Sequence, residues 1–206
     1  IIGKSDTVIL DKLAHACLID AAKLSGATLR IFPHNDLNKL EKLLTSSSGR
    51  TLIVTESVFS MDGDLCPLSE IVKLKEKHGA LLFLDEAHAI GVLGQTGQGL
   101  AEKLNLQDQI DFQMGTLGKS LGSAGGYLAA SRPWIDLFIN KARSLVYSTA
   151  PPPSQAAASL AALSLLNSPE GIARRDRLKT YSDSFGSPTP IIPKIIGENR
   201  SALAAS

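Results

Sequence analysis

Two short motifs in this chain hold side chains that can bind a ligand covalently or by charge. The first is Asp85-Glu-Ala-His88, which ends a run of apolar residues, and the second is Gly115-Thr-Leu-Gly-Lys119-Ser-Leu-Gly122. Both follow stretches that are typical of buried strands, and ligands of open α/β sheets bind at strand ends. The sequence therefore predicts a ligand site that contains Asp85 and Lys119.

Asp-Glu-Ala-His and Gly-Lys-Ser also occur in P-loop helicases, but two features argue against a nucleotide-driven motor. A P-loop requires glycine five residues before the glycine of Gly-Lys-Ser, and position 113 is Gln. The lysine motif must also precede the acidic strand, whereas Lys119 follows Asp85. A different chemistry must account for the two motifs.

A lysine amine and a buried carboxylate are the groups that chemistry with pyridoxal 5'-phosphate (PLP) requires. The amine forms a Schiff base with the cofactor aldehyde, and the carboxylate keeps the pyridine nitrogen protonated so that the ring accepts electrons. Asp85 ends the apolar run 81–84, where a charge needs a partner. The local sequence leaves open a cap or loop ion pair for Asp85 and a solvated surface charge for Lys119.

Three glycines surround Lys119 and permit close backbone approach to a ligand, at positions 115, 118 and 122. Thr116 offers a hydroxyl where a phosphate could bind. A glycine-rich lysine loop is weak evidence by itself. The pairing of Lys119 with Asp85 is what supports a cofactor site.

The segments that position these motifs alternate between strand and helix patterns. The apolar runs 51–55 and 80–84 flank a helical stretch between Pro67 and Gly79. Strands that are apolar throughout are buried on both faces, as in a parallel sheet with helical crossovers. Further strands are expected at 111–115, 126–130 and 191–196, and helices at 37–44 after the cap Asp36, 133–142 and 154–166. The predicted fold class is α/β, a mostly parallel sheet flanked by helices.

Composition argues against several other classes of protein. Lys and Arg total 21 against 20 Asp and Glu, so a net charge of +1 gives no general attraction to nucleic acid or anionic membranes. No apolar run approaches the roughly 18 residues of a membrane span. Cys17 and Cys66 match no metal-binding spacing and fit a reducing compartment. We expect a cytoplasmic protein without a metal site.

Four blocks, in order along the chain, resemble the signature of the α-oxoamine synthases. These are fold-type I PLP enzymes that condense an amino acid with an acyl thioester and release CO₂. The blocks are Glu56-Ser-Val-Phe-Ser-Met-Asp-Gly-Asp64, Asp85-Glu-Ala-His-Ala-Ile-Gly-Val-Leu-Gly94, Thr116-Leu-Gly-Lys119 and Tyr147-Ser-Thr-Ala-Pro-Pro152. Segments 11–15 and 32–36 also match, so the resemblance extends along nearly the whole chain.

The resemblance implies a role for each residue that matches the blocks. Lys119 would be the Schiff-base lysine and later acid or base, and Asp85 the partner of the pyridinium. His88 would hydrogen-bond the phenolic oxygen of PLP, Thr116 its phosphate, and His15 would stack on the ring. Without the resemblance, His15 is more often a structural residue.

Three further residues receive roles only through the resemblance. Ser60 would line the cofactor site, and Ser148 and Thr149 would reach the phosphate from a neighbouring subunit, which implies a homodimer with shared active sites. Ordinarily all three are turn residues. For His34 and the loop 91–99 we expect turn chemistry and chain reversal only.

Within the family, block 56–64 with Cys66-Pro-Leu68 most resembles the acyltransferase of biotin biosynthesis. That member condenses L-alanine with pimeloyl-CoA or a pimeloyl-carrier protein to give 8-amino-7-oxononanoate. A serine palmitoyltransferase-like or glycine-using member stays open, since segment 82–88 also suits the former. An inactive partner or scaffold subunit is the alternative if the chain is a fragment, although the presence of Lys119 argues against it.

The resemblance also divides the chain. Residues 1–180 would be the PLP-binding large domain with its N-terminal part missing, because the chain opens Ile1-Ile2-Gly3-Lys4 without an initiator Met. Residues 181–206 would be the remnant of an incomplete C-terminal small domain, which includes a segment rich in Ser, Gly and Pro at 182–193.

Overall fold

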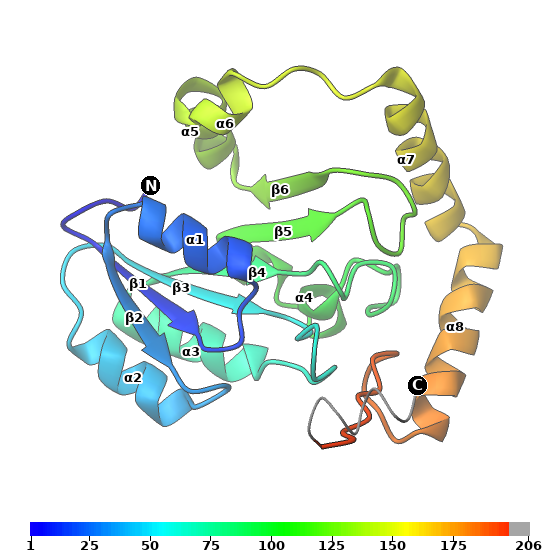
Figure 1. The fold of residues 1–206 in the computed structure, drawn as a ribbon, viewed down its shortest axis with the longest axis horizontal. Helices are drawn as coiled ribbons and strands as arrows, with labels where there is room; N and C mark the ends of the chain where they lie inside the picture. The colour runs from blue at the N-terminus through cyan, green and yellow to red at the C-terminus, as the bar shows by residue number, and fades with distance from the viewer. Residues whose placement is uncertain (198–206) are drawn as a thin grey trace.

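A six-stranded sheet forms the centre of the computed structural model, which describes residues 1–197 (Figure 1). The strand order is β2-β1-β3-β4-β5-β6, with all neighbours parallel except β5 and β6. The strands are β1 (Thr7–Asp11), β2 (Thr28–Phe32), β3 (Thr51–Glu56), β4 (Leu81–Asp85), β5 (Phe112–Thr116) and β6 (Gly126–Ala130). The predicted fold class, a mostly parallel sheet flanked by helices, is confirmed.

Helices join the strands and cover the sheet on both faces (Figure 1). They are α1 (Ala16–Leu24), α2 (Leu37–Thr45), α3 (Leu68–His78), α4 (Leu100–Lys103), α5 (Arg132–Lys141), α6 (Arg143–Val146), α7 (Pro153–Leu166) and α8 (Pro169–Ser184), with a 3₁₀ turn at Gln107–Gln109. Within the described residues, no helix is both long and apolar enough to cross a membrane.

The core has a larger part on one face of the sheet and a smaller part on the other. In the larger part, Ile9, Ile53 and Leu82 pack with apolar residues of α2 and α3. In the smaller part, Val8 and Leu10 pack with residues of α1. Along the central strands, the side chains on both faces of the sheet are buried. The sequences of these strands are therefore continuous apolar runs.

Two predicted helix boundaries have the expected local chemistry. The Asp36 side chain accepts a hydrogen bond from the Lys39 amide at 2.9 Å and caps α2. Gly79 ends α3 in the left-handed region, with φ 61°.

The predicted strand at 191–196 is wrong. This segment has no ladder partner among the described residues, and Ile195 is 93% exposed. Pro193 has no N–H to donate to a ladder. The main chain of Ile191 instead lies against Gly63, whose carbonyl accepts a hydrogen bond from the Thr189 hydroxyl at 2.6 Å.

No prediction covered β1, β2, α1, α4, α6 or α8, although β1 is an apolar run that is buried at every position. Of these, α8 continues to Ser184 and so crosses the predicted boundary at 180/181. The division into two domains stays a prediction, and its last residues, 198–206, lie outside the described part of the chain.

Candidate active site

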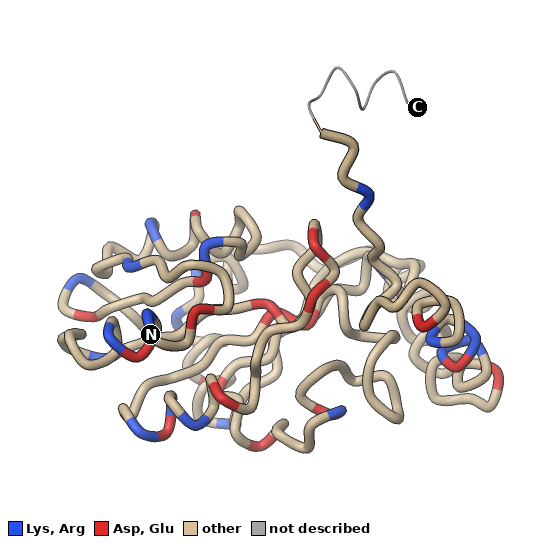
Figure 2. The backbone as a smooth tube through the Cα atoms, turned by 90° about the horizontal axis from the view of Figure 1, so that it is seen from below, with Lys and Arg blue, Asp and Glu red and all other residues tan. Residues whose placement is uncertain are grey.

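The carboxyl ends of the parallel strands bring several polar residues to one edge of the sheet. Asp11 ends β1, Glu56 ends β3 and Asp85 ends β4. Glu56 and Asp85 are direct partners in the β3–β4 register. Acidic positions accordingly form a row across the middle of the molecule, whereas most Lys and Arg lie toward its sides (Figure 2). Strand direction alone therefore builds a carboxylate-rich edge.

Asp85 is a buried carboxylate with one oxygen that still lacks a partner. Asp85 is only 4% exposed, and its Oδ1 accepts a hydrogen bond from the Ala87 amide at 2.8 Å. Oδ2 accepts none from any residue that the structure describes. Burial raises the pKa of Asp85, opposed by the Ala87 amide and by the positive charges of Lys119 and His15. A cationic partner would relieve this cost.

Lys119 lies in the loop after β5, on the same side of the sheet edge as Asp85. Its ammonium lowers the pKa of Asp85, Glu56 and His88, so the structure brings the amine to this group of residues. The loop is held by the Gly122 amide, which donates to the Lys119 carbonyl at 3.0 Å. Lys119 itself is exposed and thus accessible to a ligand.

Ser120 fixes the lysine loop to the segment that follows Asp85. Its hydroxyl donates to the Ile90 carbonyl at 2.6 Å. A Cβ on Gly91 would come within 2.6 Å of the Ser120 hydroxyl oxygen, so glycine is needed for this close approach. The two motifs predicted from the sequence are therefore joined directly.

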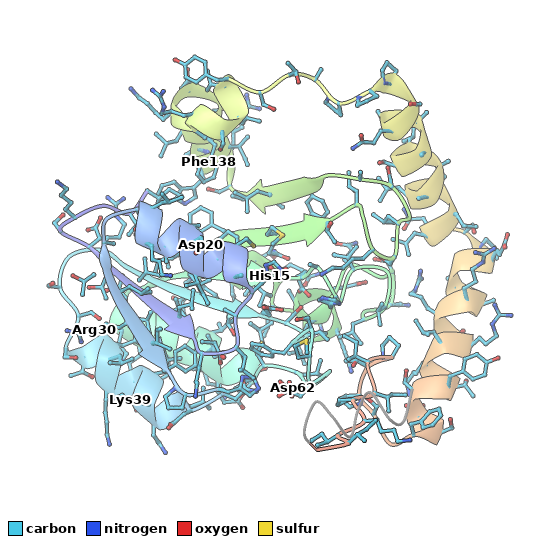
Figure 3. All side chains as sticks on the ribbon, in the orientation of Figure 1. His15, Asp20, Arg30, Lys39, Asp62 and Phe138 are labelled. Carbon is cyan, nitrogen blue, oxygen red and sulfur yellow. The ribbon has the colours of Figure 1, made fainter. Side chains whose placement is uncertain are left out.

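Two histidines complete this group. His15 precedes α1 at the end of that helix nearest the carboxyl edge (Figure 3), and its Nδ1 accepts from the Cys17 amide at 3.2 Å. His88 lies in the turn after β4. Burial lowers the pKa of His88, and the charges of Lys119 and His15 lower it further. His88 is consequently a neutral imidazole at pH 7.

Thr116 and Ser60 lie at the same edge but make different contacts. The Thr116 hydroxyl donates to the Gly125 carbonyl at 3.1 Å and accepts from the Gly118 amide at 3.2 Å, so it organises the lysine loop. Ser60 is half-buried in the turn after β3. Their contacts to a phosphate or cofactor stay predictions.

Ser148 and Thr149 are not brought to this group. Both are exposed in the connection between α6 and α7, on the far side of β6 from β4 (Figure 1). The Ser148 hydroxyl bonds only to the Thr149 carbonyl, at 3.3 Å, within the part of the chain that is described. Their predicted role concerns a neighbouring subunit and is untested by this chain alone.

Glu56 is the site residue that sequence reasoning missed. It is 2% exposed, and Oε1 accepts the His15 main-chain amide at 2.5 Å. Burial and the charge of Asp85 raise the pKa of Glu56 to about 7. The available signal was that Glu56 and Asp85 both end apolar strands on either side of one helical crossover.

Glu86 and the loop 91–99 are structural. The buried Glu86 carboxylate accepts the amides of Leu100 at 3.0 Å and Ala101 at 2.8 Å. Within the loop, the Gly91 amide donates to the Gly97 carbonyl at 2.8 Å. This chain reversal agrees with the turn chemistry expected for the loop.

His34 also has a structural position. Its ring nitrogens lie 3.1 Å from an Asp11 oxygen and 2.8 Å from an Asp64 oxygen, so it connects the turns after β2 and β3. The ring packs edge-on against Phe59, at 4.3 Å between centroids.

The group as a whole is chemically complementary to PLP. An accessible amine, a buried carboxylate with a free oxygen and a neutral imidazole match an aldehyde, a protonated pyridine nitrogen and a phenolic oxygen. The residues present therefore fit this cofactor.

Comparison with known proteins gives matches along almost the whole chain. The model of the family "Aminotransferase class I and II" matches residues 1–187. The 8-amino-7-oxononanoate synthase of Geobacter sulfurreducens is 48% identical over 98% of this chain, and that of Citrifermentans bemidjiense is 47% identical over 96%. The chain spans only 56% and 54% of these two relatives.

Solved structures of similar fold include two serine palmitoyltransferases. The enzyme from Sphingomonas wittichii has a TM-score of 0.86 and 32% identity, covering 92% of this chain and 50% of its own. The enzyme from S. paucimobilis, solved with bound PLP and myriocin, has a TM-score of 0.84 and 34% identity. This similarity covers 88% of the present chain and 46% of the chain of that enzyme.

Proposed function

The chain belongs to the aminotransferase class I and II family, and from this premise we propose that it forms the PLP-binding part of an α-oxoamine synthase. The observation that carries the proposal is the convergence of Lys119 and Asp85. The buried carboxylate needs a cationic partner, and the positive charge of Lys119 lowers its pKa. Both residues lie at the carboxyl edge of the sheet, where α/β enzymes bind their ligands.

When bound, PLP supplies an electron sink for the carbanion that forms at Cα of an amino acid. Lys119 would hold the cofactor aldehyde through its amine and would then move the α-proton. Asp85 would hold the proton of the pyridine nitrogen. His88, being neutral, would donate a hydrogen bond to the phenolic oxygen.

The remaining residues orient the cofactor. His15 would lie against the ring face, Ser60 would line the site and Thr116 would bind the phosphate. Ser148 and Thr149 would reach that phosphate from a second subunit of a homodimer, which their exposure permits. In this scheme residues 1–180 belong to the PLP-binding large domain and 181–206 to the small domain.

The proposed substrates are L-alanine and a pimeloyl thioester carried by CoA or a carrier protein. Condensation with loss of CO₂ gives 8-amino-7-oxononanoate for biotin. The identities of 48% and 47% to two proteins of that name support this choice. The free thiols Cys17 and Cys66 suit a cytoplasmic location.

A serine palmitoyltransferase-like activity is the second candidate. The fold similarity to two such enzymes favours it, with TM-scores of 0.84 and 0.86. Their identities of 34% and 32% are lower than those of the proteins named 8-amino-7-oxononanoate synthase, which is why alanine is preferred to serine here.

The test has a binding part and a substrate part. The full-length protein is incubated with PLP, reduced with borohydride and digested, and peptide mass spectrometry should find the adduct on Lys119 and none on any lysine in Lys119→Ala. An adduct elsewhere in the wild-type protein would refute the lysine assignment.

Thiol release is then measured with alanine, serine or glycine and pimeloyl-CoA or palmitoyl-CoA. The alanine and pimeloyl-CoA pair should react fastest, and a preference for serine and palmitoyl-CoA would select the second candidate.

A further inference from the structure

Two buried carboxylates lie side by side at the centre of the site, and the proposed chemistry uses only one. Glu56 and Asp85 are register partners on β3 and β4, and both are almost fully buried. Neighbouring strands of a sheet lie roughly 5 Å apart, so the side chains of register partners come at about that separation. Two negative charges at that separation in a buried site repel each other strongly.

Several charged or titratable groups face Glu56 from the elements around it. They are Asp11 of β1, His15 and Cys17 at the start of α1, Asp85 of β4 and Lys119 of the loop after β5. A single lysine cannot neutralise Asp11, Glu56 and Asp85 together. Both carboxylate oxygens of Asp11 already have partners. They accept hydrogen bonds from the amides of Leu13 at 2.8 Å and Asn35 at 3.0 Å, and one lies 3.1 Å from the His34 ring.

Glu56 and Asp85 therefore compete for the remaining positive charge. The proposed cofactor adds a second cation, the pyridinium, but directs it to Asp85. Glu56 has its one described hydrogen bond through Oε1, from the main chain of His15. A carboxylic acid can accept that bond at its carbonyl oxygen without carrying a charge.

We propose that Glu56 is a positioning residue: its carboxyl group, protonated beside an ionised Asp85, holds the main chain of His15 at the mouth of the site. This role rests on the proposed function, because His15 is the residue that would lie against the cofactor ring. The hydrogen bond ties the start of α1 to the end of β3 across 41 residues of sequence. The proton on Glu56 leaves the single negative charge of the pair on Asp85.

The charge state is tested through stability, without the cofactor. The pKa of Glu56 rises to about 7 on folding, above its ordinary value of 4.5, so the native state binds the proton more tightly than the unfolded state. Its contribution is therefore fully present below about pH 4.5 and is lost as pH rises through about 7. The urea midpoint of the full chain should fall over this pH range, and the midpoint of the Glu56→Gln variant should fall distinctly less.

Glu70→Gln is the matched control, because Glu70 is an exposed glutamate on α3. It should reproduce the wild-type decline. A Glu56→Gln profile that runs parallel to the wild type would overturn the proposed protonation. Loss of the decline in both variants would overturn it equally, since the effect would then not be specific to position 56.

The positioning role is tested by hydrogen exchange of the His15 amide. Glu56→Gln keeps the acceptor oxygen and should leave exchange within about twofold of the wild type. Glu56→Leu has similar size but no acceptor and should speed exchange about tenfold, in line with loss of one hydrogen bond. Equal protection in the Leu and wild-type proteins would overturn the role, as would equal loss in Gln and Leu.

Failure of the proposed function is seen separately. The PLP adduct on Lys119 reports the cofactor, whereas urea midpoints and hydrogen exchange report Glu56 in the same protein without PLP. If no adduct forms but both Glu56 results hold, the tie to His15 stands and only its link to PLP is lost.

Discussion

At the scale of single residues, the site depends on the unequal surroundings of similar groups. Asp85 and Glu56 are both buried strand-end carboxylates, yet Asp85 accepts an amide of its own turn and Glu56 an amide 41 residues away. Glu86, the neighbour of Asp85, is fully used as a cap for α4. Asp85 and Glu56 thus each combine burial, a free oxygen and the nearby charge of Lys119, and Glu56 differs by its bond to the main chain of His15.

Replacing Asp85 by Asn tests this distinction. The amide keeps the size of the side chain but cannot hold a proton on the pyridine nitrogen, so PLP should still attach to Lys119 while the condensation slows by about 10²–10³-fold. Thiol release measures the rate, and borohydride trapping measures attachment. Wild-type rates in Asp85→Asn would contradict the assignment of Asp85.

At the scale of elements, turns are fixed by carboxylates and histidines that connect them. His34, in the turn after β2, contacts Asp11 at the end of β1 and Asp64 in the turn after β3. Burial lowers the pKa of His34, but hydrogen bonds to Asp64 and Asp11 outweigh it and raise the pKa above the usual 6.5. The protonated ring is therefore the form that stabilises the fold.

The His34 connection should make stability depend on pH. Its contribution is fully present below about pH 6.5 and is lost as pH rises through the higher pKa of the folded state. His34→Gln should cost about 1–3 kcal/mol near pH 6 and less at pH 9, by urea unfolding. A cost that does not change with pH would show that the ring acts only through packing.

Glycine conformation at the start of α4 gives a second prediction at this scale. Gly99 has φ 110°, and a Cβ there would lie 2.5 Å from Glu86 Oε2. Gly99→Ala should therefore cost about 2–4 kcal/mol, since it adds backbone strain to displacement of a buried carboxylate. Gly79→Ala is the control, because Gly79 has φ 61° but nothing within 4 Å of the added Cβ, and should cost only about 1 kcal/mol. Equal urea midpoints would contradict the contact with Glu86.

Elements also decide what the sequence could predict. The buried strands β3 and β4 and the capped helices α2 and α3 have patterns that are visible in one segment, and their ends were predicted closely. The edge strand β2 is partly exposed and contains Arg30, and α8 has Arg and Lys scattered around it, so neither has a clear apolar face. The apolar run at 191–196 led to a wrong prediction, because a strand also needs a neighbouring strand in the sheet with which it can pair.

The site residues show the same limit: a residue could be predicted where its signal lies within one segment of the sequence. Asp85 and Lys119 could be proposed from the sequence because each lies in a motif at the end of a predicted strand. Glu56 lay in a matched block but received no role, because its importance comes from its register with Asp85 and its bond to His15. Neither relation can be read from one segment alone.

At the scale of the whole molecule, α7 and α8 stand beyond the carboxyl edge of the sheet and must be held to it (Figure 1). Near Lys119, the Ser159 hydroxyl of α7 donates to the Ser123 hydroxyl at 2.8 Å. From α8, Arg175 donates to the Gln95 carbonyl at 3.1 Å and to the Leu166 carbonyl at 2.8 Å. Arg175 is only 8% exposed, so a buried cation links α8 to the loop 91–99.

Arg175→Met should release α8 from the body of the protein. The substitution keeps part of the side-chain bulk but removes both donors and leaves two carbonyls without their partner, at a cost of about 2–4 kcal/mol. Arg174→Met is the control, because Arg174 makes an exposed pair with Glu170 one turn away and should cost no more than about 0.5 kcal/mol. Limited proteolysis should cut Arg175→Met within 167–187 several-fold faster than the control. Equal cleavage of the two variants would mean that apolar packing, and not the arginine, attaches α8 beside the site.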